Sequence, residues 1–375
     1  MANNDRLHEL QTMPYEQYLL TPEWQERRQL MLERAGHRCQ ICNSSSDLQV
    51  HHRTYERRGN ENLGDATTAG DLTVLCQSCH EKFHDRLPAQ EKSHAFVKML
   101  DVAKAFLSEK PYRIHGVPTG FDSIDLALAG GLQKSDLILI GGRTRVGKTA
   151  FALKIAYNSA CQQQKVAFFS LEMKKTQLYQ RLVAMISRID LFRLRQGWIE
   201  KDDVPVITAA QRETYALPLW INDTTMTIEE IYRQTKQLIA EQQGIDLVIV
   251  DYLGFIETNK SYSTVEQKIS FISRSLKLMA REFDIPVVVL CQLSRSLENR
   301  YDKTPVLTDL RDSGSQEQDA DVVLFIHREG IYDNSVDQKE AKIIIAKQRN
   351  GPTSSWQVRY HNEYTLFEDY SRDDE

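Results

Sequence analysis

Residues 142–149, Gly142-Arg-Thr-Arg-Val-Gly147-Lys148-Thr149, constrain the fold of this chain more than any other segment. They match the phosphate-loop pattern G-x-x-x-x-G-K-[ST], follow an apolar run at Leu137–Ile140 and precede a helix-forming stretch. A strand, a glycine-rich turn and a helix in this order let backbone N–H groups face phosphates at the helix N-terminus. The segment therefore predicts an α/β nucleotide-binding domain, in which Lys148 contacts the β- and γ-phosphates of ATP and the Thr149 hydroxyl binds Mg²⁺. The predicted loop contacts are Gly142, Gly147, Lys148 and Thr149.

Six short apolar runs in the C-terminal two thirds predict a mostly parallel sheet covered by helices on both faces. Asp251 directly follows one of these runs, and a carboxylate at the carboxyl end of a buried strand suits the Mg²⁺-linked acid of a phosphate-loop enzyme. Glu172 follows another run, where it could polarise an attacking water or serve only as a charge at a helix start. The runs are Leu137–Ile140, Val166–Phe169, Leu247–Val250, Val287–Leu290, Val322–Ile326 and Ile343–Ala346.

Two Cys-x-x-Cys pairs lie within the first 84 residues, together with His51, His52, His80 and His84. The four thiolates of Cys39, Cys42, Cys76 and Cys79 suffice for a closed, tetrahedral Zn²⁺ site, which leaves the histidines for a second, open metal site. His80 and His84 are four residues apart and share one face of a predicted helix. His51 can complete a three-histidine site, so that His52 is free to act as a general base that activates water. The alternative is a zinc-stabilised module that docks on DNA without cutting it.

Length and composition indicate the class of protein. A chain of 375 residues suits two or three domains, and a net charge of −5 restricts any DNA contact to a local groove or loop. Cysteines in Cys-x-x-Cys pairs indicate metal binding in a reducing compartment. The first residues lack the features of a signal peptide, and no apolar run approaches the roughly 20 residues that span a bilayer. We therefore expect a cytoplasmic protein without membrane contacts.

Two helices are expected outside the sheet region. Thr21 and Pro22 are a typical N-cap and first turn, and they predict a helix that ends before Gly36. Residues 92–109 have an apolar face at helical spacing and predict an amphipathic linker helix. The expected organisation is an N-terminal helical segment (1–36), a zinc domain (37–90), a linker helix (91–112), a nucleotide-binding domain (113–368) and an acidic tail (369–375).

Five segments resemble, in family order, the C-terminal ATPase domain of DnaB-type replicative helicases, a RecA-like fold, over about residues 113–368. One departure is Thr144, where the family usually has proline. The segments are Gly116–Phe121, Ser170–Met173, Cys291–Arg295, Asp309–Asp321 and Ala346–Pro352.

The resemblance implies a homo-hexameric ring that moves along DNA by hydrolysing ATP. Glu172 would be the catalytic base, Asp251 the Mg²⁺-linked acid and Gln292 the γ-phosphate sensor. Lys347 and Arg349 would reach the nucleotide of the neighbouring subunit. The linker helix would pack on the adjacent subunit, with packing on its own domain as the alternative. The loop expected to contact the DNA backbone contains Arg311, Asp312 and Gly314.

Residues 34–86 resemble zinc-knuckle HNH endonucleases. The resemblance rests on both Cys-x-x-Cys pairs, on His51-His52-Arg-Thr-Tyr55, on Gly59-Asn-Glu61 and on the segment Asp71–His84. It implies a ββα-metal fold with His51, His80 and His84 on a catalytic Mg²⁺, Mn²⁺ or Zn²⁺ ion. The family has an asparagine at the position of Asp71, so either Asp71 or Asn62 would orient His52.

The combined expectation is an ATP-driven DNA helicase or translocase fused to a metal-dependent DNA endonuclease. Phage defence or mobile-element DNA processing is a compatible setting, although no residue specifies it. One alternative is a phage or plasmid replicative helicase whose zinc domain only binds DNA or a partner. The other is a RecA-like recombination or clock ATPase.

Overall fold

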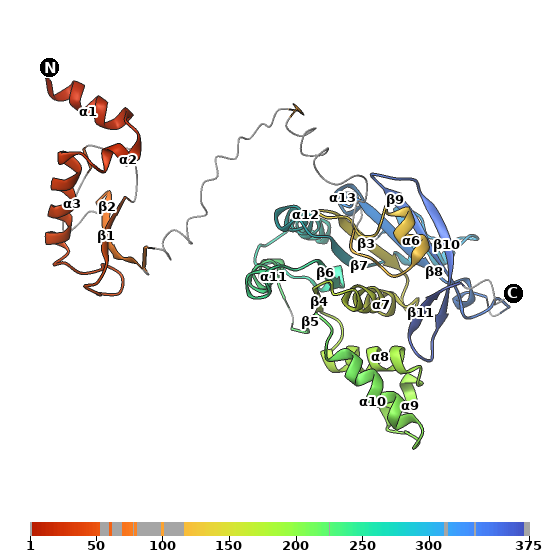
Figure 1. The fold of residues 1–375 in the computed structure, drawn as a ribbon. Helices are drawn as coiled ribbons and strands as arrows, with labels where there is room; N and C mark the ends of the chain where they lie inside the picture. The colour runs from red at the N-terminus through yellow and green to blue at the C-terminus, as the bar shows by residue number, and fades with distance from the viewer. Residues whose placement is uncertain are drawn as a thin grey trace. The chain divides into compact units, whose positions relative to one another are not determined.

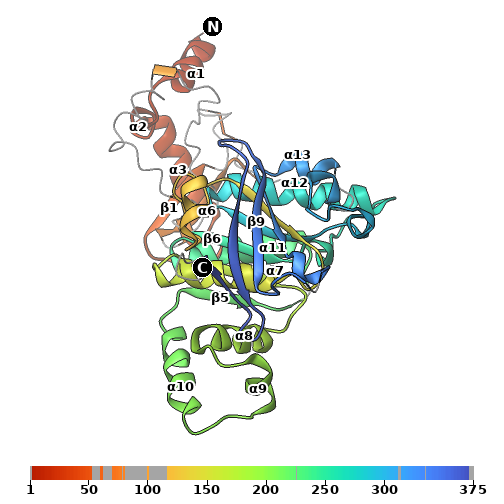
Figure 2. The same ribbon diagram turned by 90° about the vertical axis from the view of Figure 1, so that its right-hand side faces the viewer.

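The computed structural model describes residues 2–52, 60–61, 70–77, 79–80, 99–100, 116–224, 226–310, 314–333 and 335–370. The chain divides into two compact units, Met1–Glu109 and Lys110–Glu375 (Figures 1 and 2). The expected linker helix lies outside the described residues except for positions 99 and 100, which are helical. His84, Arg311 and Asp312 also lie outside them. No helix in the described ranges has the length and apolar character that crossing a bilayer requires.

In the part of the N-terminal unit that the structure describes, the helices α1, α2 and α3 pack against a two-stranded antiparallel sheet. The predicted helix is confirmed as α3 (Pro22–Arg34), whose N-cap Thr21 accepts a hydrogen bond from the Trp24 N–H at 3.3 Å. The core between helices and strands contains Leu10, Tyr18, Trp24, Met31, Leu32, Leu72 and Val74. The other elements are α1 (Ala2–Thr12), α2 (Tyr15–Tyr18), β1 (Leu48–His52) and β2 (Leu72–Cys76).

A nine-stranded sheet in the order β11-β10-β9-β8-β3-β7-β6-β4-β5 forms the centre of the C-terminal unit. The strands from β8 to β5 along this order are parallel, and β9, β10 and β11 extend one edge in antiparallel fashion. The strands are β3 (Leu137–Gly142), β4 (Val166–Ser170), β5 (Leu219–Asn222), β6 (Leu247–Asp251), β7 (Val287–Gln292), β8 (Val322–His327), β9 (Glu340–Gln348), β10 (Ser354–His361) and β11 (Leu366–Asp369).

Both faces of this sheet are covered, which explains why its central strands are apolar throughout. Ile138 and Ile140 of β3 pack in one core with Phe151 of α7, whereas Leu137 and Leu139 pack in a second core with residues of α12. Figure 1 shows α7 on one side of the strands and α11 and α12 on the other, with α8, α9 and α10 gathered beyond β5. The helices are α6 (Asp122–Ala127), α7 (Lys148–Cys161), α8 (Lys175–Ser187), α9 (Leu191–Gln196), α10 (Asp203–Thr214), α11 (Ile228–Gln242), α12 (Val265–Phe283) and α13 (Gly314–Asp319).

Candidate functional site

The phosphate loop connects β3 to α7, as the sequence predicts. Gly147 is the N-cap of α7 with a φ of 100°, in the left-handed region that favours glycine. A Cβ at this position would also meet the Phe367 ring at 2.8 Å, so the loop cannot accept a side chain here. Lys148 Nζ donates to the carbonyl oxygens of Gly142 at 2.9 Å and Arg143 at 3.0 Å, and burial lowers the pKa of Lys148. In this structure the lysine side chain therefore binds the backbone of the loop that carries it.

A cavity of about 570 Å³ opens beside this loop and gathers most of the predicted nucleotide contacts. Lys148, Thr149, Glu172 and Gln292 all line it. Because β3, β4 and β7 are parallel, their carboxyl ends meet at one edge of the sheet and bring these side chains together. Arg181, Tyr360, Asn362 and Thr365 also line the cavity, and no sequence pattern marked them.

Asp251 lies at the end of β6 with an exposure of 1%. It is hydrogen-bonded to Thr149, and burial raises its pKa to about 6. Its Oδ2 atom is buried and has no hydrogen-bond partner among the described residues. A buried carboxylate oxygen of this kind beside the Thr149 hydroxyl fits a hard divalent cation such as Mg²⁺.

The substitution Asp251→Asn is expected to stabilise the nucleotide-free protein while it impairs ATP hydrolysis. The folded-state pKa of about 6 lies above the ordinary value of about 3.9, so this group's stabilisation is present below pH 3.9 and is lost as the pH rises through 6. The asparagine avoids this loss, which amounts to roughly 1–3 kcal/mol at pH 7.5. Thermal unfolding at pH 4 and pH 7.5 checks the prediction. An equal gain at both pH values would contradict it.

Lys347 and Arg349 do not line the cavity beside their own phosphate loop. Lys347 lies near the end of β9 and Arg349 directly after it, and both contact α13, through Glu317 and Gln318. Gly314 of the expected DNA-binding loop is the first residue of α13. The roles of these residues toward a neighbouring subunit and DNA stay predictions.

The four cysteines form the cluster that the spacing predicts. The Sγ atoms of Cys39, Cys42, Cys76 and Cys79 all lie within 4.8 Å of one another. Zn–S bonds of about 2.3 Å in a tetrahedron place sulfur atoms about 3.8 Å apart, so the cluster fits a zinc ion. Although burial opposes ionisation, backbone N–H groups of Cys42, Cys76 and Ile41 lower the pKa of Cys39 to about 6.

His51 and His80 meet beside this cluster. His51 Nδ1 lies 3.0 Å from His80 Nε2, and the two rings are arranged edge to face. His51 ends β1 together with His52, and His80 follows Cys79 by one residue. Two of the three predicted ligands of the open metal site are therefore adjacent.

His52 points into the N-terminal unit, and its side chain is fully buried. Its Nδ1 lies 3.1 Å from the Tyr15 hydroxyl and its Nε2 lies 3.2 Å from Glu61 Oε1. The Trp24 ring stacks on the imidazole with centroids 4.6 Å apart. The carboxylate in contact with His52 thus belongs to Glu61. The orienting role predicted for Asp71 stays untested, and its alternative Asn62 lies outside the described residues.

Glu61 is itself fixed by two further residues. Its Oε1 accepts the Tyr18 hydroxyl at 2.5 Å, and its Oε2 lies 3.1 Å from Arg27 Nε. The sequence resemblance included Glu61 in a motif but gave it no role, because its partners lie in α2 and α3, far away along the chain.

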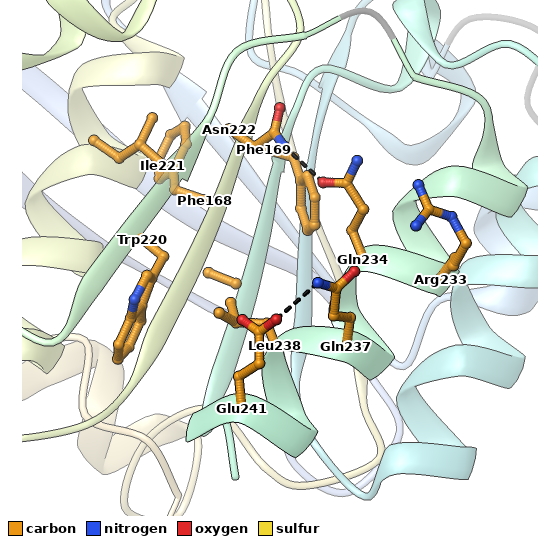
Figure 3. A pocket seen from close by; sticks show the side chains of 11 residues that line it. Phe168, Phe169, Trp220, Ile221, Asn222, Arg233, Gln234, Gln237, Leu238 and Glu241 are labelled. Atoms are coloured by element: carbon orange, nitrogen blue, oxygen red, sulfur yellow. Dashed lines mark hydrogen bonds between the residues drawn. The ribbon is translucent and has the colours of Figure 1, made fainter. Parts of the chain in front are cut away.

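A second cavity, of about 370 Å³, lies between β5 and α11 (Figure 3). Its amide and carboxylate groups bind one another: Asn222 donates to Gln234 at 2.6 Å, and Gln237 donates to Glu241 at 2.7 Å. The lining residues share none of the phosphate-loop chemistry, so we assign no function to this cavity.

Comparisons with known proteins match both units of the chain. Residues 116–369 match the DnaB-like helicase C-terminal domain, and residues 39–86 match the HNH endonuclease family. A probable replicative DNA helicase of Trieres chinensis is 43% identical over 334 residues, which cover 84% of this chain and 73% of the relative. Replicative DNA helicase DnaB of Geobacillus stearothermophilus is 37% identical over 316 residues, with 82% and 69% covered.

Solved structures agree with the fold. One is the structure of a DnaB-like replicative helicase and its interactions with primase, with a TM-score of 0.68 and 34% sequence identity. The match covers 73% of this chain and 66% of the solved chain. A second solved structure, an isolated ATPase domain, has the same TM-score, identity and coverage of this chain, and 97% of that domain is matched. These matches argue against the recombination and clock ATPase alternative. The chain belongs to the DnaB-like helicase family, and an HNH-family domain precedes its helicase domain.

Proposed function

We propose that this protein is a ring-forming, ATP-driven DNA translocase whose N-terminal domain cleaves DNA phosphodiester bonds. The motor part is supported by the cleft that gathers Lys148, Thr149, Glu172 and Gln292 around a phosphate loop. The nuclease part is carried by one observation, the 3.0 Å approach of His51 and His80 beside four clustered cysteines. A zinc cluster needed only for folding does not explain the paired imidazoles.

In the motor, the chain's own residues bind and orient the nucleotide. Backbone N–H groups at the start of α7 and the Lys148 ammonium group would hold its phosphates. Thr149 and Asp251 would hold Mg²⁺, which neutralises charge on the transferred phosphate. Glu172 would orient the attacking water, and Gln292 would contact the γ-phosphate. Relatives named as replicative DNA helicases support DNA as the substrate, and membership of the DnaB-like family supports a hexamer as the active form.

In the nuclease, His51 and His80 would hold a divalent ion together with His84. Such an ion stabilises charge on the scissile phosphate and the leaving oxygen. Glu61 contacts Nε2 of His52, so Nδ1 would be the nitrogen that accepts a proton from water once the Tyr15 hydroxyl has moved away. The Tyr15 hydroxyl stands 3.1 Å from Nδ1, in the place that the attacking water would need. Cleavage therefore requires α2 to withdraw from β1.

Replacing His52 by alanine is expected to reduce cleavage of DNA by about 10²–10⁴-fold, the usual contribution of a general base. The assay uses purified full-length protein, single- and double-stranded DNA, and Mg²⁺ or Mn²⁺, with and without ATP. Tyr15→Phe is the matched control, because it removes the hydroxyl beside Nδ1 and keeps the ring; it should cut at least as fast as the wild type. Equal cutting by His52→Ala and the wild type would rule out His52 as the base.

The second candidate function is a helicase whose HNH domain only binds DNA or a partner. The full burial of the His52 side chain favours it, since a buried imidazole cannot reach a phosphate. Wild-type protein that unwinds DNA and binds it through residues 1–109, but cuts no substrate with either metal, would establish this function in place of the nuclease.

A further inference from the structure

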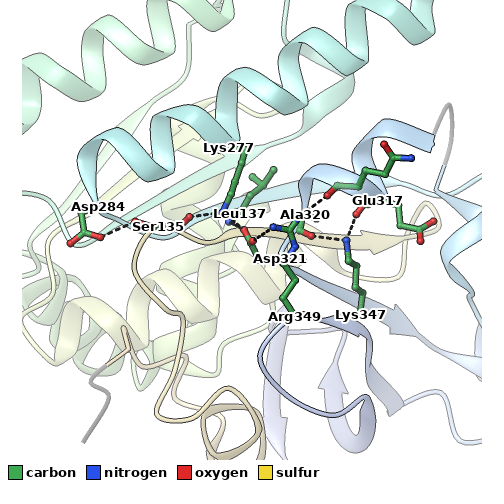
Figure 4. A network of polar contacts seen from close by, with 10 residues as sticks. Ser135, Leu137, Lys277, Asp284, Glu317, Ala320, Asp321, Lys347 and Arg349 are labelled. Carbon is green, nitrogen blue, oxygen red and sulfur yellow. Dashed lines mark hydrogen bonds and ion pairs between the residues drawn. The ribbon is translucent and has the colours of Figure 1, made fainter. Parts of the chain in front are cut away.

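The two cations assigned to the neighbouring nucleotide are both held by α13 (Figure 4). Lys347 Nζ donates to the carbonyl oxygens of Glu317 and Ala320, the latter at 2.8 Å. Arg349 Nη2 donates to the carbonyl oxygen of Gln318 at 2.7 Å. These oxygens lie at the C-terminal end of the helix, where carbonyl groups lack helical partners and favour cations. Both side chains are therefore fixed before any neighbour is present.

Asp321 adds a second anchor for Arg349. Its carboxylate is 6% exposed, and Oδ1 lies 3.3 Å from Arg349 Nη1. Oδ2 accepts the backbone N–H of Leu137 at 2.8 Å and also pairs with Lys277 Nζ. Leu137 is the first residue of β3, whose other end leads into the phosphate loop. Asp321 thus connects Arg349 to the strand that carries this subunit's own nucleotide loop.

The anchored guanidinium group of Arg349 has further N–H groups that these contacts do not use. Its contacts with Gln318 and Asp321 use two of the five N–H groups that an arginine carries. The Arg349 side chain is 49% exposed. An anion outside the subunit can therefore be bound without breaking the internal contacts, which is the geometry of a preorganised donor.

We propose that Asp321 is a positioning residue for Arg349, which it holds so that the exposed donors meet the γ-phosphate in the adjacent subunit. This inference rests on the proposed ring and on Arg349 acting in trans. An arginine supplied in trans is worth about 10³–10⁵ in turnover, and a misplacement of about 1 Å can cost about 10²-fold. Loss of the Asp321 carboxylate should therefore lower ATP turnover in the adjacent subunit.

Mixed rings separate this role from a role in folding. An Arg349→Ala subunit has an intact nucleotide cleft but supplies no arginine to the cleft of its neighbour. A Lys148→Ala subunit supplies that arginine but has an impaired cleft of its own. Each alone should be nearly inactive, and mixing them should restore ATP turnover at the Arg349→Ala clefts. Donor subunits that carry Lys148→Ala together with Asp321→Asn should restore at least tenfold less ATP turnover. The loss should appear as a lower kcat, with little change in the KM for ATP.

The matched control donor combines Lys148→Ala with Asp284→Asn. Asp284 lies at the other end of the same network, where it is 63% exposed and accepts the Ser135 hydroxyl at 2.8 Å. This donor should restore turnover fully. Equal restoration by the Asp321→Asn donor overturns the role of Asp321, whereas no restoration by the plain Lys148→Ala donor overturns the action of Arg349 in trans.

A donor with Asp321→Glu covers the case in which Asp321→Asn does not assemble. Glutamate keeps the charge but moves the carboxylate outward by about 1.5 Å, one C–C bond. It can no longer meet the Leu137 N–H and Arg349 together, so restoration should again fall at least tenfold. Full restoration by this assembled donor would also overturn the inference. Ring formation by each variant is checked by sedimentation before turnover is measured.

Discussion

Removal of zinc by a strong chelator is expected to unfold Met1–Glu109 and to leave Lys110–Glu375 folded. Among the described residues of the N-terminal unit, the hydrophobic core between helices and strands is small and contains Leu10, Tyr18, Trp24, Met31, Leu32, Leu72 and Val74. A structural Zn²⁺ ion contributes about 10–16 kcal/mol of apparent binding energy, which exceeds the stability of most small domains. Calorimetry should show one transition lost and one retained. ATP turnover should persist once the chelator has been removed and Mg²⁺ has been added back.

Two serine substitutions test the same expectation without a chelator. Cys39→Ser removes a ligand of the cysteine cluster and should unfold the N-terminal unit. Cys161→Ser alters an exposed cysteine of α7 outside the cluster and should have little effect. Loss of the motor transition on chelation, or an intact N-terminal unit in Cys39→Ser, would contradict the assignment of zinc to this cluster.

Lys148→Ala is expected to lower ATP turnover by about 10²–10³-fold, the usual cost of removing one preorganised charge donor from a transition state. The Lys148 ammonium group is hydrogen-bonded to the carbonyl oxygens of Gly142 and Arg143 within the loop, and it is the one charged side chain among the predicted contacts Gly142, Gly147, Lys148 and Thr149. Turnover is measured at saturating ATP with and without single-stranded DNA, and unwinding is measured in parallel.

Lys134→Ala provides the control for this variant. Lys134 is 69% exposed and pairs at 3.6 Å with Asp284, away from the cleft lining. Its replacement should leave turnover within about twofold of the wild type, as surface substitutions usually do. A Lys148→Ala protein with similar turnover would show that the cleft at the phosphate loop is not the site of hydrolysis.

The central sheet could be predicted because its strands are continuous apolar runs. All six predicted runs lie in strands, from β3 to β9. The strand β5 was missed because its residues Leu219–Asn222 are only half-buried at the sheet edge. The strand β10 was missed for another reason: its inward residues Val358 and Tyr360 alternate with polar ones, a period of two that a search for continuous runs passes over.

The nucleotide cleft and the nuclease site differ in how far the sequence could predict them. The local motif identifies Lys148 and the family resemblance identifies Gln292, and both line the cleft because parallel strands bring their carboxyl ends to one edge of the sheet. The surroundings of His52 depend on how α2 and α3 pack over β1. Tyr15, Trp24 and Glu61 surround the imidazole through long-range contacts, which residue spacing alone does not reveal.

The antiparallel strands β9 and β10 connect residues that line the subunit's own cleft to Lys347, which we propose contacts the nucleotide of the neighbouring subunit. The turn after β10 supplies Asn362 and Thr365 to the subunit's own cleft, and the end of β9 carries Lys347. The two strands are hydrogen-bonded from Ile345↔Ser354 to Glu340↔Arg359, so neither can slide without breaking the ladder. In the proposed ring, a shift of this pair of strands when nucleotide binds one cleft would therefore also move Lys347 at the next cleft, which would couple neighbouring subunits.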